Sequence, residues 1–243
     1  MRKFYASLIV VFCLCQLPAG TQAQSQSQSQ SQSGSGGKWT WLFDGKSVAR
    51  LRGYMMDSFP SQAWKVEDGA LVAQTDVPNV DFLTRDNYKN FELSLDWAVS
   101  SGGNSGVFYY VVEKSAHESH NGNSPNWLDN FEMQILDDIG FNDTAAIRSA
   151  GSLYDLIVPK NKVLKPVGQY NTARLIVNRG HVEHWLNGVK IVEYDLGSAA
   201  IKALISKSKY RNNPDFAKNT DGHIMFQHHG QKVWLKDIKI RSL

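Results

Sequence analysis

The chain has 243 residues and a formal net charge of +3, with basic and acidic side chains interspersed along its length. This mixture has no basic stripe that would indicate a nucleic-acid partner and no basic amphipathic helix that would indicate a membrane surface. The two cysteines, Cys13 and Cys15, both lie near the N-terminus. We therefore expect the folded region to depend on packing and hydrogen bonds rather than on disulfides.

The N-terminus has the pattern of a secretory signal peptide over residues 1–23. Arg2 and Lys3 provide the basic start, residues 4–17 are almost wholly apolar, and Thr21-Gln22-Ala23 places small residues at the cleavage positions. The apolar run is shorter than the roughly 20 residues that a membrane span needs, so we expect no membrane insertion after cleavage. Residues 24–37 are rich in Ser, Gln and Gly, which predicts a flexible linker. The expected location is the periplasm or the cell exterior.

Residues 38–243 are predicted to form one domain that consists almost entirely of β-strands. Glu67-Asp68-Gly69 and Asn187-Gly188 indicate tight hairpins, and residues 91–97 alternate strictly between apolar and polar side chains. Residues 198–210 predict one short surface helix with Ser198 as its N-cap. Many short strands without interleaved helices predict an all-β fold, a two-sheet antiparallel sandwich. In chain order, the predicted strands cover residues 39–43, 64–66, 70–72, 91–97, 106–112, 131–136, 172–177, 181–186, 189–194, 223–228 and 233–240.

The strand at residues 131–136 is the first candidate for a functional site. Its period of two places Phe131, Met133 and Ile135 on one face and Glu132 and Gln134 on the other. If the apolar face fills the core, the carboxyl and amide groups point away from it. An ordinary solvated sheet face would show the same alternation, so this strand alone leaves both interpretations open.

Two histidine-containing strands add further candidates. In residues 223–229, Gln227 and His229 share one face, and such side chains bind polyols or transfer protons near neutral pH. In residues 181–186, His184 is in phase with Val182 and Leu186, so it lies on an otherwise apolar face. Taken alone, His184 is better explained as a core histidine with a hydrogen-bond partner.

A glycine-rich segment and several aromatic residues could complete a binding site. Gly102-Gly103-Asn104-Ser105-Gly106 joins two strands; its glycines allow backbone to approach a ligand, and Asn104 offers both a donor and an acceptor. A tight hairpin would explain the same segment. Trp127 and Tyr154 are candidates for stacking against sugar rings, as are Trp185 and Trp234, although most tryptophans in such a domain belong to the core.

Several known catalytic motifs are missing from the sequence. His117-Glu118-Ser119-His120 has its histidines three apart rather than four, so it does not match the zinc protease motif. No phosphate-binding loop, dinucleotide fingerprint or nucleophile elbow is present. A site built from Glu132, His184 and His229 could bind a divalent metal, and the sequence does not decide this point.

Several segments, in order along nearly all of residues 38–243, resemble the 3-keto-disaccharide hydrolase domain family, a concanavalin-like jelly roll. The resemblance implies that fold for the sandwich. The segments that carry it are Trp41-Leu42-Phe43-Asp44-Gly45-Lys46, residues 64–71 (WKVEDGAL), residues 91–97 followed by residues 102–108 (GGNSGVF), residues 131–137 (FEMQILD), residues 184–188 (HWLNG), and residues 227–230 followed by residues 233–238.

The same resemblance implies an activity on 3-keto-glycosides, with an upstream glycoside 3-oxidase that makes the ketone. The ketone acidifies the proton at C2, a base removes that proton, the C1 substituent leaves, and water adds. The resemblance suggests Glu132 or His184 as the base and His229 as the acid or enolate stabiliser. The residues expected to hold sugar hydroxyls are Arg85, Asn104, Gln134, Gln227 and Lys236.

The sequence departs from the family pattern at two positions. Lys236 stands where the family usually has Arg, and His228 stands where it usually has Asp. A non-catalytic carbohydrate-binding module of the same fold is the main alternative, because one fold hosts many functions. An ordinary glycosidase needs a facing pair of carboxyl groups. Only Glu132 and Asp137 suggest themselves for that pair, and strand parity places them on opposite faces.

Overall fold

The computed structural model describes residue 1, residues 37–114 and residues 129–243. Residues 2–23 of the predicted signal peptide, residues 24–36 of the predicted linker, and Trp127 lie outside the described residues. Residues 37–114 and 129–243 belong to one compact unit, and the following description concerns this unit alone. None of the helices in the described residues is long and apolar enough to span a membrane.

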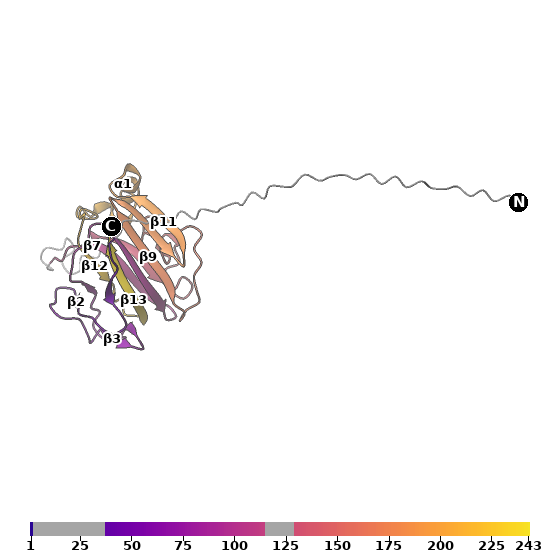
Figure 1. Ribbon diagram of the computed structural model, residues 1–243. Helices are drawn as coiled ribbons and strands as arrows, with labels where there is room; N and C mark the ends of the chain where they lie inside the picture. Colours follow the sequence, from indigo (N-terminus) through magenta and orange to yellow (C-terminus); the bar gives the residue numbers. More distant parts are fainter. Residues whose placement is uncertain (2–36, 115–128) are drawn as a thin grey trace, which may run out of the picture. The chain divides into compact units, whose positions relative to one another are not determined.

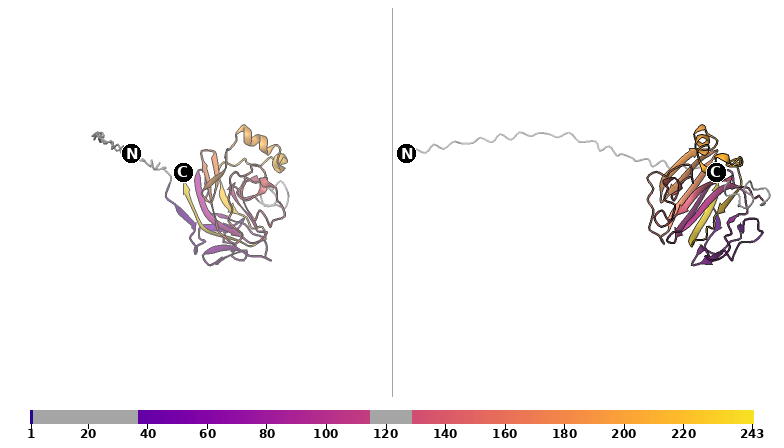
Figure 2. Two further views of the ribbon diagram at one scale, coloured as in Figure 1. Left: turned by 90° about the vertical axis from the view of Figure 1, so that its right-hand side faces the viewer. Right: turned by 180° about the vertical axis from the view of Figure 1, so that it is seen from behind.

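Two antiparallel sheets pack face to face, which confirms the predicted all-β sandwich (Figures 1 and 2). The eight-stranded sheet has the order β11-β10-β9-β6-β13-β4-β3, and β1 pairs with β13 beside this path. Its strands are β1 (Thr40–Phe43), β3 (Trp64–Glu67), β4 (Ala70–Ala73), β6 (Phe91–Val99), β9 (Asn171–Asn178), β10 (His181–Leu186), β11 (Val189–Asp195) and β13 (Val233–Ser242).

The second sheet has five strands in the order β2-β5-β12-β7-β8. Its strands come from widely separated parts of the sequence, so long-range pairing builds the sheet that carries most of the candidate polar residues. They are β2 (Leu51–Gly53), β5 (Phe82–Thr84), β7 (Asn104–Val111), β8 (Phe131–Leu136) and β12 (His223–Phe226).

The core lies between the sheets and is rich in aromatic residues. Phe82 of β5 and Phe226 of β12 stack with ring centroids 4.7 Å apart, and Trp64 meets Phe82 edge-on at 4.9 Å. Phe131, Met133 and Ile135 of β8 belong to the same buried cluster. The predicted face assignment of β8 is therefore confirmed, and Glu132 and Gln134 point away from the core.

The predicted turns form as expected, whereas the glycine-rich segment differs in part. Asn187 and Gly188 both adopt positive φ in the β10–β11 hairpin, as do Asp68 and Gly69 between β3 and β4. The segment at residues 102–106 is not entirely a connection, because β7 already begins at Asn104. Asn104 is thus held by strand pairing with Leu136 of β8.

The predicted helix is present but shorter than expected. Helix α1 (Ala199–Ile205) begins where Ser198 accepts a hydrogen bond from the Ile201 N–H, and Ile201 is its buried residue. The chain then forms a separate 3₁₀ turn, η3 (Lys209–Asn212), which the Ser208 side chain caps. A second 3₁₀ turn, η2 (Ala146–Arg148), follows β8. The predicted single helix is therefore two elements, α1 and η3. Of these, η3 contributes to the site described next.

Candidate functional site

A polar cavity of about 430 Å³ lies on the face of the five-stranded sheet that points away from the core. It gathers side chains from β7, β8 and η3, and from the segments just before β5, after η2 and after β12. Its lining is Asn79, Asp81, Asn104, Glu132, Gln134, Tyr154, Lys209, Gln227, His228 and His229. Six of these residues, Asn104, Glu132, Gln134, Tyr154, Gln227 and His229, were predicted from the sequence to form a site, and the structure brings them together.

Glu132 is the buried acid of this cavity. It is 6% exposed and lies on β8, whose outer edge is bordered by residues 151–154 through backbone hydrogen bonds such as Tyr154 N–H to Glu132 O. Burial raises the pKa of Glu132 to about 8; nearby Lys209 opposes this shift and Asp81 adds to it. Near neutral pH the group can therefore exchange a proton, which an ordinary exposed glutamate does poorly.

Lys209 brings a positive charge into the cavity from η3. Its backbone N–H donates to Asp155 Oδ2 at 2.9 Å, and its ammonium lies 4.1 Å from the ring centroid of Tyr154. Burial lowers the pKa of Lys209, while the negative charge of Glu132 opposes that shift. The sequence interpretation assigned this stretch to a surface helix, so Lys209 was missed as a functional residue.

Asp81 is a second buried carboxyl group in the same cavity, and the sequence interpretation missed it as well. It immediately precedes β5, is 8% exposed, and accepts a hydrogen bond from the His228 backbone N–H at 2.7 Å. Burial raises the pKa of Asp81 to about 6, and the His228 N–H opposes the shift. Asp81 lies within a segment of mixed polarity, where no periodic pattern marks it out.

His228 and His229 differ in their environments. His228 is 3% exposed, packs edge-on against Trp64, and accepts a hydrogen bond from the Gly230 N–H at Nδ1. Burial lowers the pKa of His228, so this ring is held neutral near pH 7. His229 is exposed; its Nδ1 lies 2.9 Å from Gln231 Oε1 and its ring packs against Phe141.

Two buried polar atoms of the cavity have no hydrogen-bond partner among the described residues. They are the Asn104 side-chain oxygen and the His228 Nε2. Buried polar groups are nearly always paired, so the unpaired Asn104 oxygen indicates a position for a bound donor. The His228 Nε2 is a donor, because the ring is neutral and its Nδ1 already accepts a hydrogen bond, so it indicates a position for a bound acceptor. A sugar hydroxyl can fill either position, since it both donates and accepts. The arrangement thus combines hydroxyl-binding groups with two buried carboxyls and a cation.

The structure places His184 outside this cavity, which corrects its assignment as a candidate base. The His184 side chain is fully buried on β10, its Nδ1 donates to Gly151 O at 3.0 Å, and its ring packs edge-on against Tyr109 and Tyr194. Burial lowers the pKa of His184 to about 4. His184 lies in the core between the two sheets, whereas Glu132 lies on the other face of the five-stranded sheet. This agrees with the alternative interpretation of His184 as a core histidine.

Two predicted sugar-binding residues also lie elsewhere. Lys236 belongs to β13 of the other sheet, where its ammonium lies 4.3 Å from the Tyr170 ring centroid and 3.7 Å from Asp237. Arg85 donates to the backbone carbonyls of Ala49 and Asp57, so it ties loops together. Neither Lys236 nor Arg85 therefore lines this cavity.

Among the described residues, no three metal-binding side chains of the cavity lie close together. The proposed combination of Glu132, His184 and His229 is separated by the sheet itself. A compact set, His181, Glu183 and Glu193, lies on β10 and β11 instead. The Lys190 ammonium already lies 3.1 Å from Glu183 and 2.8 Å from Glu193, so a cation occupies that position.

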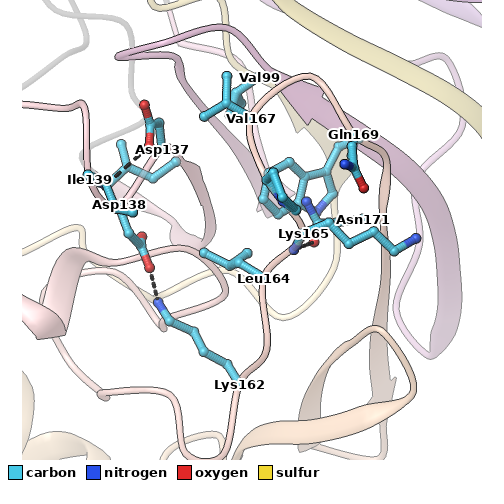
Figure 3. Close-up of a pocket in the computed structure, with 13 residues that line it drawn as sticks. Val99, Asp137, Asp138, Ile139, Lys162, Leu164, Lys165, Val167, Gln169 and Asn171 are labelled. Atoms are coloured by element: carbon cyan, nitrogen blue, oxygen red, sulfur yellow. Dashed lines mark hydrogen bonds and ion pairs between the residues drawn. The ribbon is translucent and has the colours of Figure 1, made fainter.

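A larger cavity of about 560 Å³ at the end of β8 is less suited to proton transfer (Figure 3). Its walls include the apolar side chains of Val99, Leu164 and Val167. Asp138 forms an ion pair with Lys162 at 2.6 Å, and Asp137 accepts backbone hydrogen bonds that lower its pKa despite burial. The Asp137 carboxyl is thus held in its ionised form and the Asp138 carboxyl is already paired with Lys162, so we assign the smaller polar cavity as the candidate active site.

Comparison with known proteins identifies the family. The 3-keto-alpha-glucoside-1,2-lyase-like domain matches residues 38–241. A 3-keto-disaccharide hydrolase from Bacteroides thetaiotaomicron is 33% identical over 228 residues, which cover 83% of this chain and 77% of that protein.

Solved structures agree with the fold. A protein from Parabacteroides distasonis described as a glycosyl hydrolase has a TM-score of 0.74 and 31% identity, with coverage of 85% of this chain and 94% of that one. A second such protein from the same organism has a TM-score of 0.63 and 29% identity, covering 85% and 100% of the two chains. The fold and the enzyme class predicted from the sequence are confirmed at the level of the family. The chain belongs to the 3-keto-alpha-glucoside-1,2-lyase-like domain family.

Proposed function

We propose that this enzyme cleaves the glycosidic bond of 3-keto-glycosides by proton abstraction at C2, elimination and hydration. The observation that carries the proposal is Glu132, a buried carboxyl group with a raised pKa in a polar cavity that can hold sugar hydroxyls. A base of this kind suits a proton made acidic by a neighbouring ketone. Membership of the family and the similarity to a 3-keto-disaccharide hydrolase support the substrate class.

In the first step, ionised Glu132 takes the C2 proton. The electron pair of the broken C2–H bond moves toward the C3 ketone and leaves a negative charge on its oxygen. A fixed positive charge or hydrogen-bond donor near that oxygen stabilises this enolate. Lys209 provides the positive charge in the cavity, and His229 provides a second candidate donor.

In the second step, the enolate electrons form a C1=C2 double bond as the bond from C1 to the leaving oxygen breaks. That oxygen takes a proton from an acid, for which His229 is the candidate in the cavity; Asp81, with a pKa of about 6, has already lost its proton where Glu132 is ionised. Water then adds across the double bond with its oxygen at C1 and a proton at C2. The sum of the steps is hydrolysis, with a 3-keto sugar and a free aglycone as products.

An ordinary two-carboxyl glycosidase is the second candidate function, because Asp81 joins Glu132 in one cavity. Such an enzyme would not need a ketone and would keep the C2 hydrogen of its substrate. Elimination and hydration instead place a solvent hydron at C2. Turnover in deuterated water, with enzyme-free exchange subtracted, separates the two: deuterium at C2 of the product supports elimination, and its absence supports the glycosidase.

The main test compares a 3-keto-glucoside with the unoxidised glucoside, with the purified protein assayed with added divalent metal and after chelation. We expect aglycone release from the keto compound alone. Glu132→Gln should lower kcat at least about 100-fold, the usual contribution of a general base. Glu67→Gln, on an exposed position of β3, is the matched control and should leave kcat unchanged. A near-wild-type rate for Glu132→Gln would remove Glu132 from this role.

Two properties of the biological setting are also proposed. An enzyme that oxidises the C3 hydroxyl of glycosides must supply the substrate, because the C2 proton is acidic enough only beside a ketone. The signal-like pattern of residues 1–23 supports export to the periplasm or beyond. Determination of the N-terminal residue of the protein from its native host tests export; an intact Met1 would argue against it.

A further inference from the structure

Gly106 of β7 lies directly beneath the carboxyl group of Glu132. A Cβ atom built onto Gly106 would lie 2.0 Å from Glu132 Oε1, 2.8 Å from its Cδ and 3.0 Å from its Cγ. Real Cβ atoms do not approach other heavy atoms this closely. The three nearest atoms all belong to the Glu132 side chain, so this side chain occupies the space that any other residue at position 106 would fill.

Strand register accounts for this contact. In the β7–β8 pair, Gly106 is opposite Gln134 and Phe108 is opposite Glu132. Directly paired residues point to the same face of a sheet, so Gly106 and Glu132 share the face that carries the polar cavity. The Glu132 side chain leans diagonally across the pair and rests on the bare backbone of Gly106.

Backbone geometry does not require glycine at this position. Gly106 lies inside β7 with φ outside the left-handed region, in contrast to Gly102, whose φ of +67° favours glycine. Glycine also weakens a strand interior relative to residues with side chains. Since neither conformation nor strand preference explains Gly106, the space it leaves free is its distinguishing property.

We propose that Gly106 is a positioning residue for proton transfer: its missing side chain allows the Glu132 carboxyl group to lie flat against β7, buried within the polar cavity. This inference rests on the proposed function, in which Glu132 is the base. Any side chain at position 106 would push the carboxyl group toward the open part of the cavity. There it would lose both its burial and its alignment with the sugar.

Gly106→Ala tests the proposal, because alanine adds only the Cβ atom. We expect kcat to fall about 100-fold, since a displacement of about 1 Å at a reacting group has a cost of this size. The acidic limb of the pH–rate profile should also move to lower pH, because the displaced carboxyl group is better solvated. Gly53→Ala on β2 is the matched control: the three atoms nearest to its new Cβ belong to the Met56 side chain, which does not line the cavity, and the rate should be unchanged.

A double substitution checks that Glu132 is the group displaced. Gly106→Ala should lower the melting temperature of the wild-type protein, whereas in a Glu132→Ala background it should lower it little or not at all. An equal loss in both backgrounds would mean that Gly106 contacts something other than Glu132, and the proposal would fail. A wild-type rate and pH profile for Gly106→Ala would overturn it too.

The proposal can be separated from the proposed function by a measurement without substrate. The melting temperature as a function of pH depends on the burial of Glu132, whatever reaction it performs. If wild-type protein does not cleave 3-keto-glucosides, the proposed function fails. If Gly106→Ala retains the wild-type pH dependence of stability, Glu132 has not moved, and the inference about Gly106 fails by itself.

Discussion

Glu132 and His184 illustrate how the same physical cause produces opposite roles for two residues. Burial disfavours the charged form of each group, so it raises the pKa of Glu132 to about 8 and lowers the pKa of His184 to about 4. The carboxyl group can then exchange protons near neutral pH. The imidazole remains neutral throughout this range, which suits a core residue that donates one hydrogen bond to Gly151.

The raised pKa of Glu132 predicts the pH dependence of the reaction. A base must be ionised to act, and Glu132 becomes ionised as the pH rises through about 8. We therefore expect kcat/KM for a 3-keto-glucoside to increase with pH and to level off above that value. The measurement is a pH–rate profile of the free enzyme with a fixed substrate. A rate that is already at its plateau at pH 5 would contradict a buried base.

Strand parity predicted the positions of Glu132, Gln134 and Gln227, and it also placed His184 on an apolar face. The family resemblance, and not parity, suggested His184 as a base and Lys236 as a sugar-binding residue. Parity states which face of its own strand a side chain occupies. It does not state to which sheet that strand belongs, and this depends on pairing between distant segments. His184 on β10 and Lys236 on β13 both belong to the eight-stranded sheet, while Glu132 belongs to the five-stranded sheet. The error is therefore one of long-range topology rather than of local pattern.

The 3₁₀ turn η3 determines where Lys209 lies relative to Glu132. Asp155 accepts the Lys209 N–H with one carboxylate oxygen and the Arg148 Nε–H with the other, at 2.9 and 2.8 Å. Arg148 also forms an ion pair with Asp143. Asp155 is 8% exposed, so it anchors the 3₁₀ turn from within the structure.

Substitution of Asp155 by Asn should loosen η3 without changing the cavity lining itself. Asn tolerates the positive φ of this position, but its NH₂ group would face one of the two donors that Asp155 now accepts. A lost hydrogen bond to a charged group costs about 1.5–3 kcal/mol of stability, here that of η3. Only the part of this loss that raises the activation barrier lowers kcat, at about tenfold per 1.4 kcal/mol, so we expect kcat to fall by no more than about 100-fold. Asp86→Asn is the control, because its ion pair with Arg50 is exposed and contributes little. Equal rates for the two variants would show that η3 does not position Lys209.

The start of helix α1 could be predicted from local sequence, whereas its end and the turn after it could not. Ser198 was identified as an N-cap, and its side chain accepts the Ile201 N–H at 3.2 Å. The predicted continuation to Tyr210 is interrupted because Ser208 caps a second, tighter turn through the Tyr210 N–H. The anchor for that turn is Asp155, more than 50 residues away, and no local pattern contains this contact.

For the whole molecule, the sandwich separates stability from chemistry. The two sheets bury an apolar, aromatic core between them, and the polar cavity lies on the opposite face of one sheet. The buried carboxyl groups of the cavity are therefore an energetic burden that the core must offset, because burial of an ionised group is unfavourable. Functional sites commonly reduce stability in this way.

This burden predicts how stability depends on pH. The folded-state pKa of Glu132, about 8, exceeds its ordinary value of 4.5, so the native state binds the proton more tightly than the unfolded chain does. The resulting stability is fully present below pH 4.5 and is lost as the pH rises through about 8. Glu132→Gln carries no such proton, so its melting temperature should match that of the wild-type protein near pH 4.5 and exceed it increasingly up to about pH 8.

Thermal melts of the two proteins across this pH range measure the difference directly. Each pKa unit corresponds to about 1.4 kcal/mol, and about 1 kcal/mol changes the melting temperature of a domain of this size by about 2–4 °C. The charge of Asp81, whose pKa is raised to about 6, acts on Glu132 in the wild type alone, so the same comparison in an Asp81→Asn background isolates Glu132. Glu67→Gln should show no pH-dependent gain, because Glu67 is exposed on β3. A constant difference between Glu132→Gln and wild type at every pH would mean that burial does not perturb Glu132, and both the proposed base and its positioning by Gly106 would lose their physical basis.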